Sequence, residues 1–305
     1  MSRLSRLKLL TAAVNSSAYG TDAIAAGTPL PMLTSDLAIT PIEGDTQDRP
    51  LDDGKLGNKP VALIGTHVKA TGYVEVAGAG AGTDEPAYGP ILVAAGYGAT
   101  VGAEDVTYAR VTPGTEKDVT FYLYMDGVVH KITGARATIT TVITVNEIPR
   151  REFEITGLYA GHSTNASIPA ADFSAFQKPS KVGAVQTTFQ FGSTEYKMLD
   201  FSLADNNEIT YDENTVDEQV YLTDYAIEGN VVIEAPDVGT FDPIAVALNE
   251  TLLAMSLKHG TAAGKTETIS AAEVQLLRPE YGDRNGRMTW NIPFRVINTY
   301  TITTE

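Results

Sequence analysis

The stretch GARATITTVITVNEIPRREFEITGLYA, residues 134–160, decides the fold class. In its first part, Thr138 and Thr140 alternate with aliphatic residues, and after an Ile-Pro pair Glu152 and Glu154 alternate with apolar ones. Alternate side chains of a β-strand point to opposite sides of the sheet. The two runs therefore predict a β-hairpin with one apolar face and one face of Thr, Arg and Glu. Nothing in their arrangement is typical of a catalytic site.

The charge of the whole chain restricts its partners. Its 305 residues include 38 acidic and 22 basic side chains, which gives a formal net charge of -16. A surface this acidic disfavours adhesion to nucleic-acid phosphates and to anionic membranes. There is no cysteine, which excludes disulfides, thiolate nucleophiles and Cys-ligated zinc and fits assembly in a reducing cytoplasm. A hydrophobic fraction of 43% is sufficient for packed cores.

The N-terminus resembles a secretory signal only superficially. It has a basic start, but the apolar stretch at residues 9–14 is short for a signal peptide. We expect Leu4, Leu7 and Leu10 to form one stripe of a short helix. No apolar run approaches the roughly 20 residues that a membrane-spanning helix needs, so we expect no membrane association.

The chain divides into four segments by pattern. Residues 1–60 predict an N-terminal helix and an extended arm, and the Pro-, Gly- and Asp-rich part at 40–59 is expected to become ordered only against a neighbouring subunit. A first β-domain follows at 61–162, with a short helix that starts at Pro90 and a hairpin whose Asp126-Gly127 loop is typical of a type I′ turn. A linker at 163–186 and a second β-domain at 187–305 complete the chain.

Three short matches recur in the same order in the two β-domains. THVKATGYVEVAG (66–78) matches DYAIEGNVVIEAP (224–236), YGPILVAAGY (88–97) matches FDPIAVALNE (241–250), and VNEIPRR (145–151) matches WNIPFRV (290–296). Chance similarity is the alternative, but the shared order favours a duplication. The prediction is a mainly β protein of two tandem β-sandwich or barrel domains, each with a short flanking α-helix. Val74 and Val76 should be buried as Val231 and Ile233 are, and Ile91 and Val93 should occupy the places of Ile244 and Val246.

Candidates for chemistry are few. The four histidines are far apart in sequence, and the glycines at 78, 80 and 82 do not have the spacing of a dinucleotide-binding loop. Residues 205–237 contain many acids and no Lys or Arg, which leaves a calcium loop, a glycosidase carboxylate pair or a solvated acidic face open. The order of oxygen ligands in a calcium loop is absent. We therefore expect a protein that is not an enzyme, with no catalytic residue, cofactor or metal ligand.

Several segments, taken in order, resemble the major tail tube proteins of long-tailed (siphovirus-type) bacteriophages. In the first half they are AYGTD (18–22), LAITPIEGDTQDRPLDDGKLG (37–57), AYGPILVAAG (87–96), FYLYMDGVVHKITGARATITT (121–141) and REFEITGLYAG (151–161). In the second half, the run LDFSLADNNEITYDENTVDEQVYLTDYAIEGNVVIEAP (199–236) is similar to the same family.

The resemblance implies a fold, an assembly and a location. The fold is a β-sandwich with a flanking helix, also seen in the tubes of type VI secretion systems. Subunits form stacked rings whose inner sheets join into a barrel around a channel for DNA. Rings usually hold six tube domains, so three two-domain chains would make a pseudo-hexameric ring. The implied partners are other copies of the chain, the tape measure protein and other tail proteins, with DNA passing through without specific binding. The implied location is the virion tail, and the host cytoplasm during assembly.

The polar strands are the expected walls of this channel. They are 136–145 and 150–158, with counterparts near 199–212. The candidate lumen or inter-subunit residues are Arg136, Thr138, Thr140, Arg150, Arg151, Glu152, Glu154, Asp205 and Glu208. At least one of the two adjacent arginines is expected to pair with a carboxylate across a subunit boundary. The alternative functions are a secretion-system tube component, an extracellular β-rich binding module or adhesin, and a carboxylate hydrolase.

Overall fold

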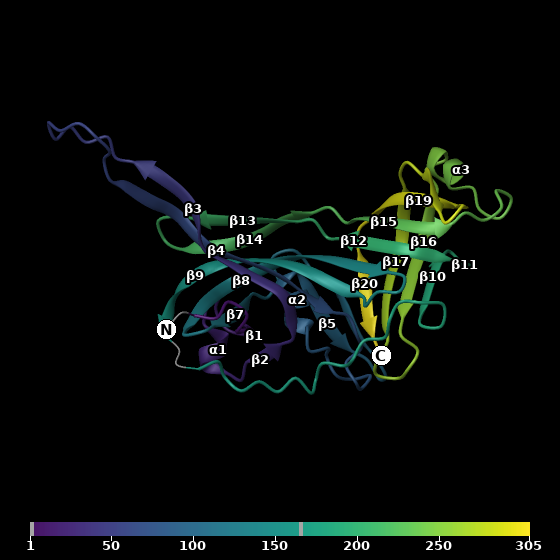
Figure 1. Ribbon diagram of the computed structural model, residues 1–305, viewed down its shortest axis with the longest axis horizontal. Coiled ribbons are helices and arrows are strands. Elements are labelled where there is room, and N and C mark those ends of the chain that lie inside the picture. Colours follow the sequence, from purple (N-terminus) through teal and green to yellow (C-terminus); the bar gives the residue numbers. More distant parts are fainter. Residues whose placement is uncertain (1–2, 165–166) are drawn as a thin grey trace.

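The computed structural model describes residues 3–164 and 167–305 (Figure 1). Strands account for 54% of the residues and three short helices for 5%, so the prediction of a mainly β protein is confirmed. Eighteen of the described strands belong to one hydrogen-bonded sheet system, and the other two form a separate hairpin. All of the strand pairings described below are antiparallel.

The first half of the chain, up to residue 164, contains nine described strands and two helices. They are β1 (Lys8–Val14), α1 (Ala23–Ala26), β2 (Leu30–Met32), β3 (Thr34–Asp48), β4 (Val61–Glu75), α2 (Gly89–Ala94), β5 (Tyr97–Val101), β6 (Val106–Arg110), β7 (Val119–Met125), β8 (Val128–Thr144) and β9 (Arg150–Thr164).

The second half contains eleven described strands and one helix. They are β10 (Thr187–Phe191), β11 (Thr194–Tyr196), β12 (Met198–Ala204), β13 (Asn207–Glu213), β14 (Glu218–Tyr225), β15 (Glu228–Glu234), α3 (Pro243–Leu248), β16 (Leu252–His259), β17 (Glu267–Leu276), β18 (Glu280–Arg284), β19 (Arg287–Val296) and β20 (Tyr300–Thr304).

Eight of these strands form one continuous run, which we call the eight-stranded sheet. Its order is β3–β4–β9–β8–β12–β15–β19–β18. The first four strands come from the first half of the chain and the last four from the second, so the two halves meet where β8 pairs with β12. We call this pairing the seam. Within the described residues, the two end strands, β3 and β18, pair with a neighbour on one side only.

The two halves repeat one cycle of strand pairings. In the first half, β1 pairs with β7, β7 with β8, β8 with β9, β9 with β4, and β4 with β3. In the second half, β10 pairs with β16, β16 with β17, β17 with β19, β19 with β15, and β15 with β12. The elements of each cycle follow one another in the same chain order. The β5–β6 hairpin interrupts the first half after α2 and has no counterpart after α3.

A glycine beneath an aromatic ring marks the same place in both halves. Gly72 on β4 lies opposite Phe153 on β9, and Gly229 on β15 lies opposite Phe294 on β19. A Cβ atom would lie 2.9 Å from the Phe153 ring at Gly72 and 2.4 Å from the Phe294 ring at Gly229. Each ring thus occupies the space that a side chain would need. The register of the two cycles therefore agrees to the residue at this point.

The halves share one hydrophobic core and do not form separate bodies. One buried cluster runs from Leu10 in β1 to Ile302 in β20. Besides the seam, β20 at the C-terminal end pairs with β6 of the first half. Between β9 and β10, the described residues 167–186 form no helix or strand, and residues 165–166 of the expected linker lie outside the described residues.

The two predicted helices are present, but their burial differs. α2 begins with Gly89-Pro90, and all of its residues are buried. α3 begins at Pro243 after Asp242, whose carboxylate accepts hydrogen bonds from two backbone N–H groups of the first turn. The expected burial of Val74, Val76, Val231 and Ile233 is confirmed. In contrast, Ile91 is buried whereas its expected counterpart Ile244 is 40% exposed.

Four finer expectations are wrong. Leu10 lies in strand β1, which pairs with both β2 and β7, and not in a helix. Of the Asp126-Gly127 loop only Gly127 has a positive φ, whereas a type I′ turn needs two such residues. Pro149 precedes β9 but Pro293 lies inside β19, so the Ile-Pro match is not a structural equivalence. Residues 40–48 were expected to become ordered only against a neighbouring subunit, but they belong to β3, which pairs with β4 of the same chain.

The distal part of the β3–β4 hairpin extends away from the rest of the molecule (Figure 1). We call residues 42–66 the projecting arm. Residues 49–60, at its tip, form no helix or strand. The β13–β14 hairpin leaves the second half at the equivalent point, between β12 and β15, but it lies against β8, β9 and β4 of the first half. One hairpin of the repeated pair therefore lies against the body of the chain, whereas most of the other projects from it.

The glycine beneath Phe294 gives a direct test of this packing. We expect Gly229→Ala to lower the free energy of unfolding by about 1–3 kcal/mol, because the new methyl group would overlap the ring and the Ser202 carbonyl oxygen, 2.7 Å away. Gly183→Ala is the matched control, since no atom lies within 4 Å of its added Cβ. Urea denaturation of both variants makes the measurement. Equal stability of the two would contradict the described register of β15 and β19.

Candidate functional site

One face of the eight-stranded sheet is predominantly polar from β4 to β19. Adjacent strands place Tyr73, Glu152, Thr140, Ala204, Glu228 and Arg295 in one row, from β4 to β19. Thr71, Glu154 and Thr138 form the next row on the first three strands. These side chains are exposed or half-buried. We call this surface the polar face. The residues between them along each strand, such as Val74, Phe153 and Ile139, point into the core.

The polar face carries more acids than bases, and several of them pair. Lys69 lies 3.8 Å from Glu154, Arg150 lies 2.9 Å from Glu152, and Arg295 lies 2.6 Å from Glu228. Glu234 lies 3.2 Å from Arg287 and 3.6 Å from Lys197, and the other acids on this face are Glu75, Asp200 and Glu280. Exposed pairs of this kind contribute little to stability, about 0–1 kcal/mol each. Their arrangement affects the surface potential of the face rather than the stability of the fold.

The structure brings together five of the nine predicted site residues. Thr138, Thr140, Glu152 and Glu154 share the polar face, where they border a shallow depression. Arg150 is on the same face and also reaches Glu147, 3.9 Å away. The alternation in the sequence was sufficient to place these residues on one side of the sheet.

Arg136 is not on the accessible part of this face, although its position in β8 has the same orientation as Thr138. It is buried, and its guanidinium donates hydrogen bonds to the backbone carbonyls of Lys117 (2.6 Å) and Glu116 (3.2 Å). Its guanidinium also lies near the Tyr19 ring. The loop before β7 therefore covers this arginine, and its sequence position gave no sign of that loop.

Arg151 is fully buried and connects the two halves. Its Nη2 lies 2.7 Å from Glu267 Oε1 on β17, and its Nε donates to the Thr141 hydroxyl. The Tyr88 hydroxyl donates to the same carboxylate at 2.6 Å, and burial raises the Tyr88 pKa well above its usual value, so this tyrosine remains a donor. Arg151 thus pairs with a carboxylate of the other half of its own chain, so the expected pair across a subunit boundary stays a prediction for Arg150.

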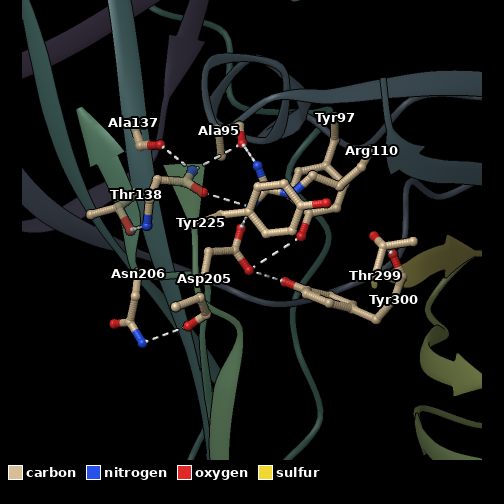
Figure 2. Close-up of polar contacts among 12 residues, drawn as sticks. Ala95, Tyr97, Arg110, Ala137, Thr138, Asp205, Asn206, Tyr225, Thr299 and Tyr300 are labelled. Carbon is tan, nitrogen blue, oxygen red and sulfur yellow. Dashed lines mark hydrogen bonds and ion pairs between the residues drawn. The ribbon is translucent and has the colours of Figure 1, made fainter. Parts of the chain in front are cut away.

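Asp205 is also fully buried, at the point where β12 ends and the β13–β14 hairpin begins (Figure 2). One carboxylate oxygen accepts hydrogen bonds from the hydroxyls of Tyr300 (2.8 Å) and Tyr97 (3.2 Å), and the other lies 3.2 Å from Arg110 Nη2. Burial raises the pKa of Asp205, and the Arg110 guanidinium opposes that shift. Asp205 therefore joins β5, β6 and β20 beside the seam and is not part of an exposed lumen wall.

Asn207 completes this cluster, and the sequence gave no indication of its role. Its side-chain amide donates to the carbonyl of Ala95, at the end of α2 (3.0 Å), and to that of Ala137 on β8 (2.8 Å). Its backbone N–H donates to the Thr138 hydroxyl. The Arg110 guanidinium stacks over the Tyr225 ring at 4.1 Å from its centroid. The second half thus covers the C-terminal end of the first half's helix.

Glu208 is exposed on β13, opposite Asp224 of β14 and outside the polar face. The expectation that residues 199–212 correspond to the 136–158 hairpin is wrong. By the repeated pairings, β12 corresponds to β3, and the counterparts of β8 and β9 are β17 and β19. Arg136, Arg151, Asp205 and Glu208 therefore lie apart from the five residues of the polar face.

The described side chains offer no evident centre for metal chemistry. Within residues 3–164 and 167–305, no group of three or more His, Asp or Glu side chains is placed to hold a metal ion. In the same part of the chain, no helix is long and apolar enough to cross a bilayer.

Comparison with known proteins yields no identification. The sequence matches no protein family model and no curated protein.

The buried Asp205 cluster gives the second prediction. We expect Asp205→Ala to lower the free energy of unfolding by about 3–5 kcal/mol, because it leaves Arg110 buried without its countercharge. Glu208→Ala, which removes a nearby exposed acid, should change it by no more than about 0.5 kcal/mol. Urea denaturation at neutral pH provides both values. A loss of unfolding free energy in Asp205→Ala as small as that in Glu208→Ala would show that Arg110 does not need Asp205 as its countercharge.

The pH dependence of the same cluster has a defined sign. The pKa of Asp205 is raised by burial, so the folded protein holds the proton more tightly than the unfolded chain does. The stabilisation from this proton is complete below the unfolded pKa of about 3.9 and is lost as the pH rises through the folded value. Asp205→Asn should abolish this contribution to the pH dependence of the free energy of unfolding. The free energy of unfolding of the wild type relative to that of the variant should therefore fall as the pH rises above about 4.

Proposed function

We propose that the protein is a structural, non-enzymatic subunit of a hollow tube, of the kind that major tail tube proteins form in long-tailed bacteriophages. The observation that carries the proposal is the eight-stranded sheet, in which two four-stranded units are joined edge to edge with a common polar face. A sheet of this kind provides a wall with a core on one side and water on the other. The segments that resemble the phage family include most of its strands β3, β8, β9 and β12 and all of β15.

The seam supplies a template for joining one chain to the next. At the seam, β8 of one half pairs with β12 of the other. When the two halves are matched by their repeated pairings, β18 of the second half corresponds to the C-terminal part of β8. In the same comparison, β3 of the first half corresponds to β12. Since both β3 and β18 have a free edge in the described chain, β18 of one copy can accept β3 of another. Such head-to-tail pairing closes into a ring when the rotation per chain is a whole fraction of a turn, and it removes both exposed edges.

A ring of three chains is the proposed closure. Each chain supplies two four-stranded halves, so three chains provide six, which is the usual number of tube domains in the family that the sequence resembles. The two halves of each chain then act as tandem tube domains, with α2 and α3 as their flanking helices. Stacked rings, with the tape measure protein and other tail proteins as further partners, would build the tube in the host cytoplasm and in the virion.

The polar face is proposed to line the channel. Its unpaired acids would repel DNA phosphates, and the net charge of -16 has the same sign as DNA. This repulsion extends over about 8 Å at physiological salt, which is effective in a narrow channel. The pairing of Glu152 with Arg150 and of Glu154 with Lys69 moderates the potential, so the wall would neither bind DNA nor exclude it.

Disulfide trapping tests the ring directly, because the chain has no cysteine of its own. Ser202 pairs with Val142 at the seam. At the two free edges, the equivalent of Ser202 is Ser35, and the equivalent of Val142 is Glu280. The first equivalence holds because Ser35 pairs with Tyr73 on β4, as Ser202 pairs with Asn230 on β15. The second holds because Glu280 pairs with Asn291 on β19, as Val142 pairs with Arg150 on β9. We expect the Ser35→Cys/Glu280→Cys variant to form disulfide-linked oligomers up to a closed trimer, seen by non-reducing electrophoresis.

Two variants make this result interpretable. Val142→Cys/Ser202→Cys is the matched positive control, since its disulfide should close within one chain. Ser35→Cys alone should give no product larger than a dimer. If the seam control closes its disulfide while the edge variant stays monomeric under conditions where the protein is concentrated and oxidised, the proposed ring is wrong.

A charge reversal tests the placement of the polar face. We expect tubes of Glu152→Lys/Glu154→Lys to retain short double-stranded DNA at low salt and to release it as the salt rises, because the variant adds positive charge to the channel wall. Glu208→Lys/Asp212→Lys makes the same change of charge on exposed β13, outside the polar face. Co-sedimentation of labelled DNA with tubes at 50 and 200 mM salt compares them. Equal retention by both variants would place Glu152 and Glu154 outside the channel.

A further inference from the structure

The outer side of α3 forms an apolar groove that the same helix of the first half does not have. The groove has a volume of about 400 Å³ and lies between α3 and the chain that leads from β17 to β18. Its apolar lining is Ile244, Ala247, Leu248, Leu277 and Pro279. Leu248 is 79% exposed, whereas every residue of α2 is buried. We call this surface the α3 groove.

A second apolar surface lies on the projecting arm. Ile42, Val61, Leu63 and Ile64 are each between 44% and 60% exposed. Exposed aliphatic residues on a free hairpin promote association with another chain unless something covers them. The β13–β14 hairpin, which leaves the second half at the equivalent point, packs one side against the first half.

The two surfaces are at opposite ends of the molecule. In Figure 1 the projecting arm extends from one end of the long axis and α3 lies at the other. They are therefore too far apart to meet within one chain. A contact between two different patches of one protein requires two copies in a head-to-tail arrangement. The β18 edge begins at Glu280, which also borders the α3 groove, so the groove is continuous with the edge at which a second copy is proposed to pair.

The interior of the chain shows how an arm meets a helix. At the end of α2, the Leu222 side chain of the β13–β14 hairpin lies 3.2 Å from the position of a Cβ added to Gly96. Leu222 is nine residues before Val231 on β15. Nine residues before the equivalent Val74 on β4 is Gly65, the neighbour of the exposed Ile64. Ile64 on the projecting arm thus lies one residue from the position that corresponds to Leu222 on the β13–β14 hairpin.

We infer that the α3 groove binds the projecting arm of a second copy of this chain, with Ile64 of one copy against Leu248 of the other. The inference rests on the proposed function, because it concerns the same contact between neighbouring chains, and it names the surfaces that make it. It explains why α3 is left uncovered in the single chain and why the arm carries aliphatic residues. Each ring contact then consists of a paired strand edge and an apolar arm in a groove.

Cross-linking of two single-cysteine proteins tests the pairing. Ile64→Cys and Leu248→Cys are purified separately, allowed to assemble together, and treated with a short bismaleimide. We expect a cross-linked dimer in the mixture in at least fivefold excess over either protein alone. Leu56→Cys, at the fully exposed tip of the arm, replaces Ile64→Cys in the matched control and should give only background with Leu248→Cys.

The outcomes separate this inference from the proposed function. If rings form but the Ile64→Cys and Leu248→Cys mixture cross-links no better than the tip control, the arm docks elsewhere and the inference is overturned while the ring stands. Efficient cross-linking of Ile64→Cys with itself would show an arm-to-arm contact and also overturn it. If the wild-type chain forms no oligomer at any concentration, both fail.

A charged substitution in the groove provides a second measurement. We expect Leu248→Lys to raise the protein concentration needed for assembly about tenfold, with monomer stability unchanged because the side chain is exposed. Val238→Lys replaces another exposed aliphatic residue, outside the groove, and should change that concentration less than twofold. Light scattering over a concentration series gives both values. Equal effects of the two substitutions would contradict the groove as the docking site.

Discussion

The pairing of β8 with β12 is the interaction on which the rest of the structure depends. β8 is long enough to serve two neighbours on one edge, since residues 128–135 pair with β7 and residues 140–144 pair with β12. Its other edge pairs with β9 along most of its length. This one strand therefore holds the first half together and also joins it to the second. Without that pairing, the eight-stranded sheet would divide into two four-stranded units, and residues 140–144 of β8 and the facing edge of β12 would lose their partners.

Two buried ion pairs stabilise the seam and fix the relative position of the halves. Arg110 and Arg151 come from the first half, and their partners Asp205 and Glu267 come from the second. A buried charge is costly unless a partner and further hydrogen bonds compensate it, and here tyrosine hydroxyls supply those bonds. Separation of the halves would leave all four charges without their partners. The halves thus repeat one pairing cycle but fold as one body, and the same geometry leaves β3, β18, the projecting arm and the α3 groove open to another chain.

Local alternation predicted the parts of this arrangement that depend on neighbouring residues. It gave the β8–β9 hairpin and the shared face of Thr138, Thr140, Glu152 and Glu154, and the Pro90 signal gave helix α2, which begins one residue earlier at Gly89. It failed where a distant segment decides the environment. Arg151 and Asp205 look like exposed strand residues in sequence, and only the second half, folded back on the first, buries them. Leu10 fits a helical stripe, but it lies in a strand because β1 pairs with β7, more than 100 residues later. The Ile-Pro match was misleading because a short apolar motif recurs easily outside structural register.

The central claim is that the eight-stranded sheet continues from one chain to the next. The most direct measurement is the mass of the purified wild-type protein in solution, combined with negative-stain images of the same sample. A closed ring should have three times the chain mass of 32.5 kDa, and its images should show a central hole. A single species at the mass of one chain over the whole accessible concentration range, with no rings in the images, would contradict the claim.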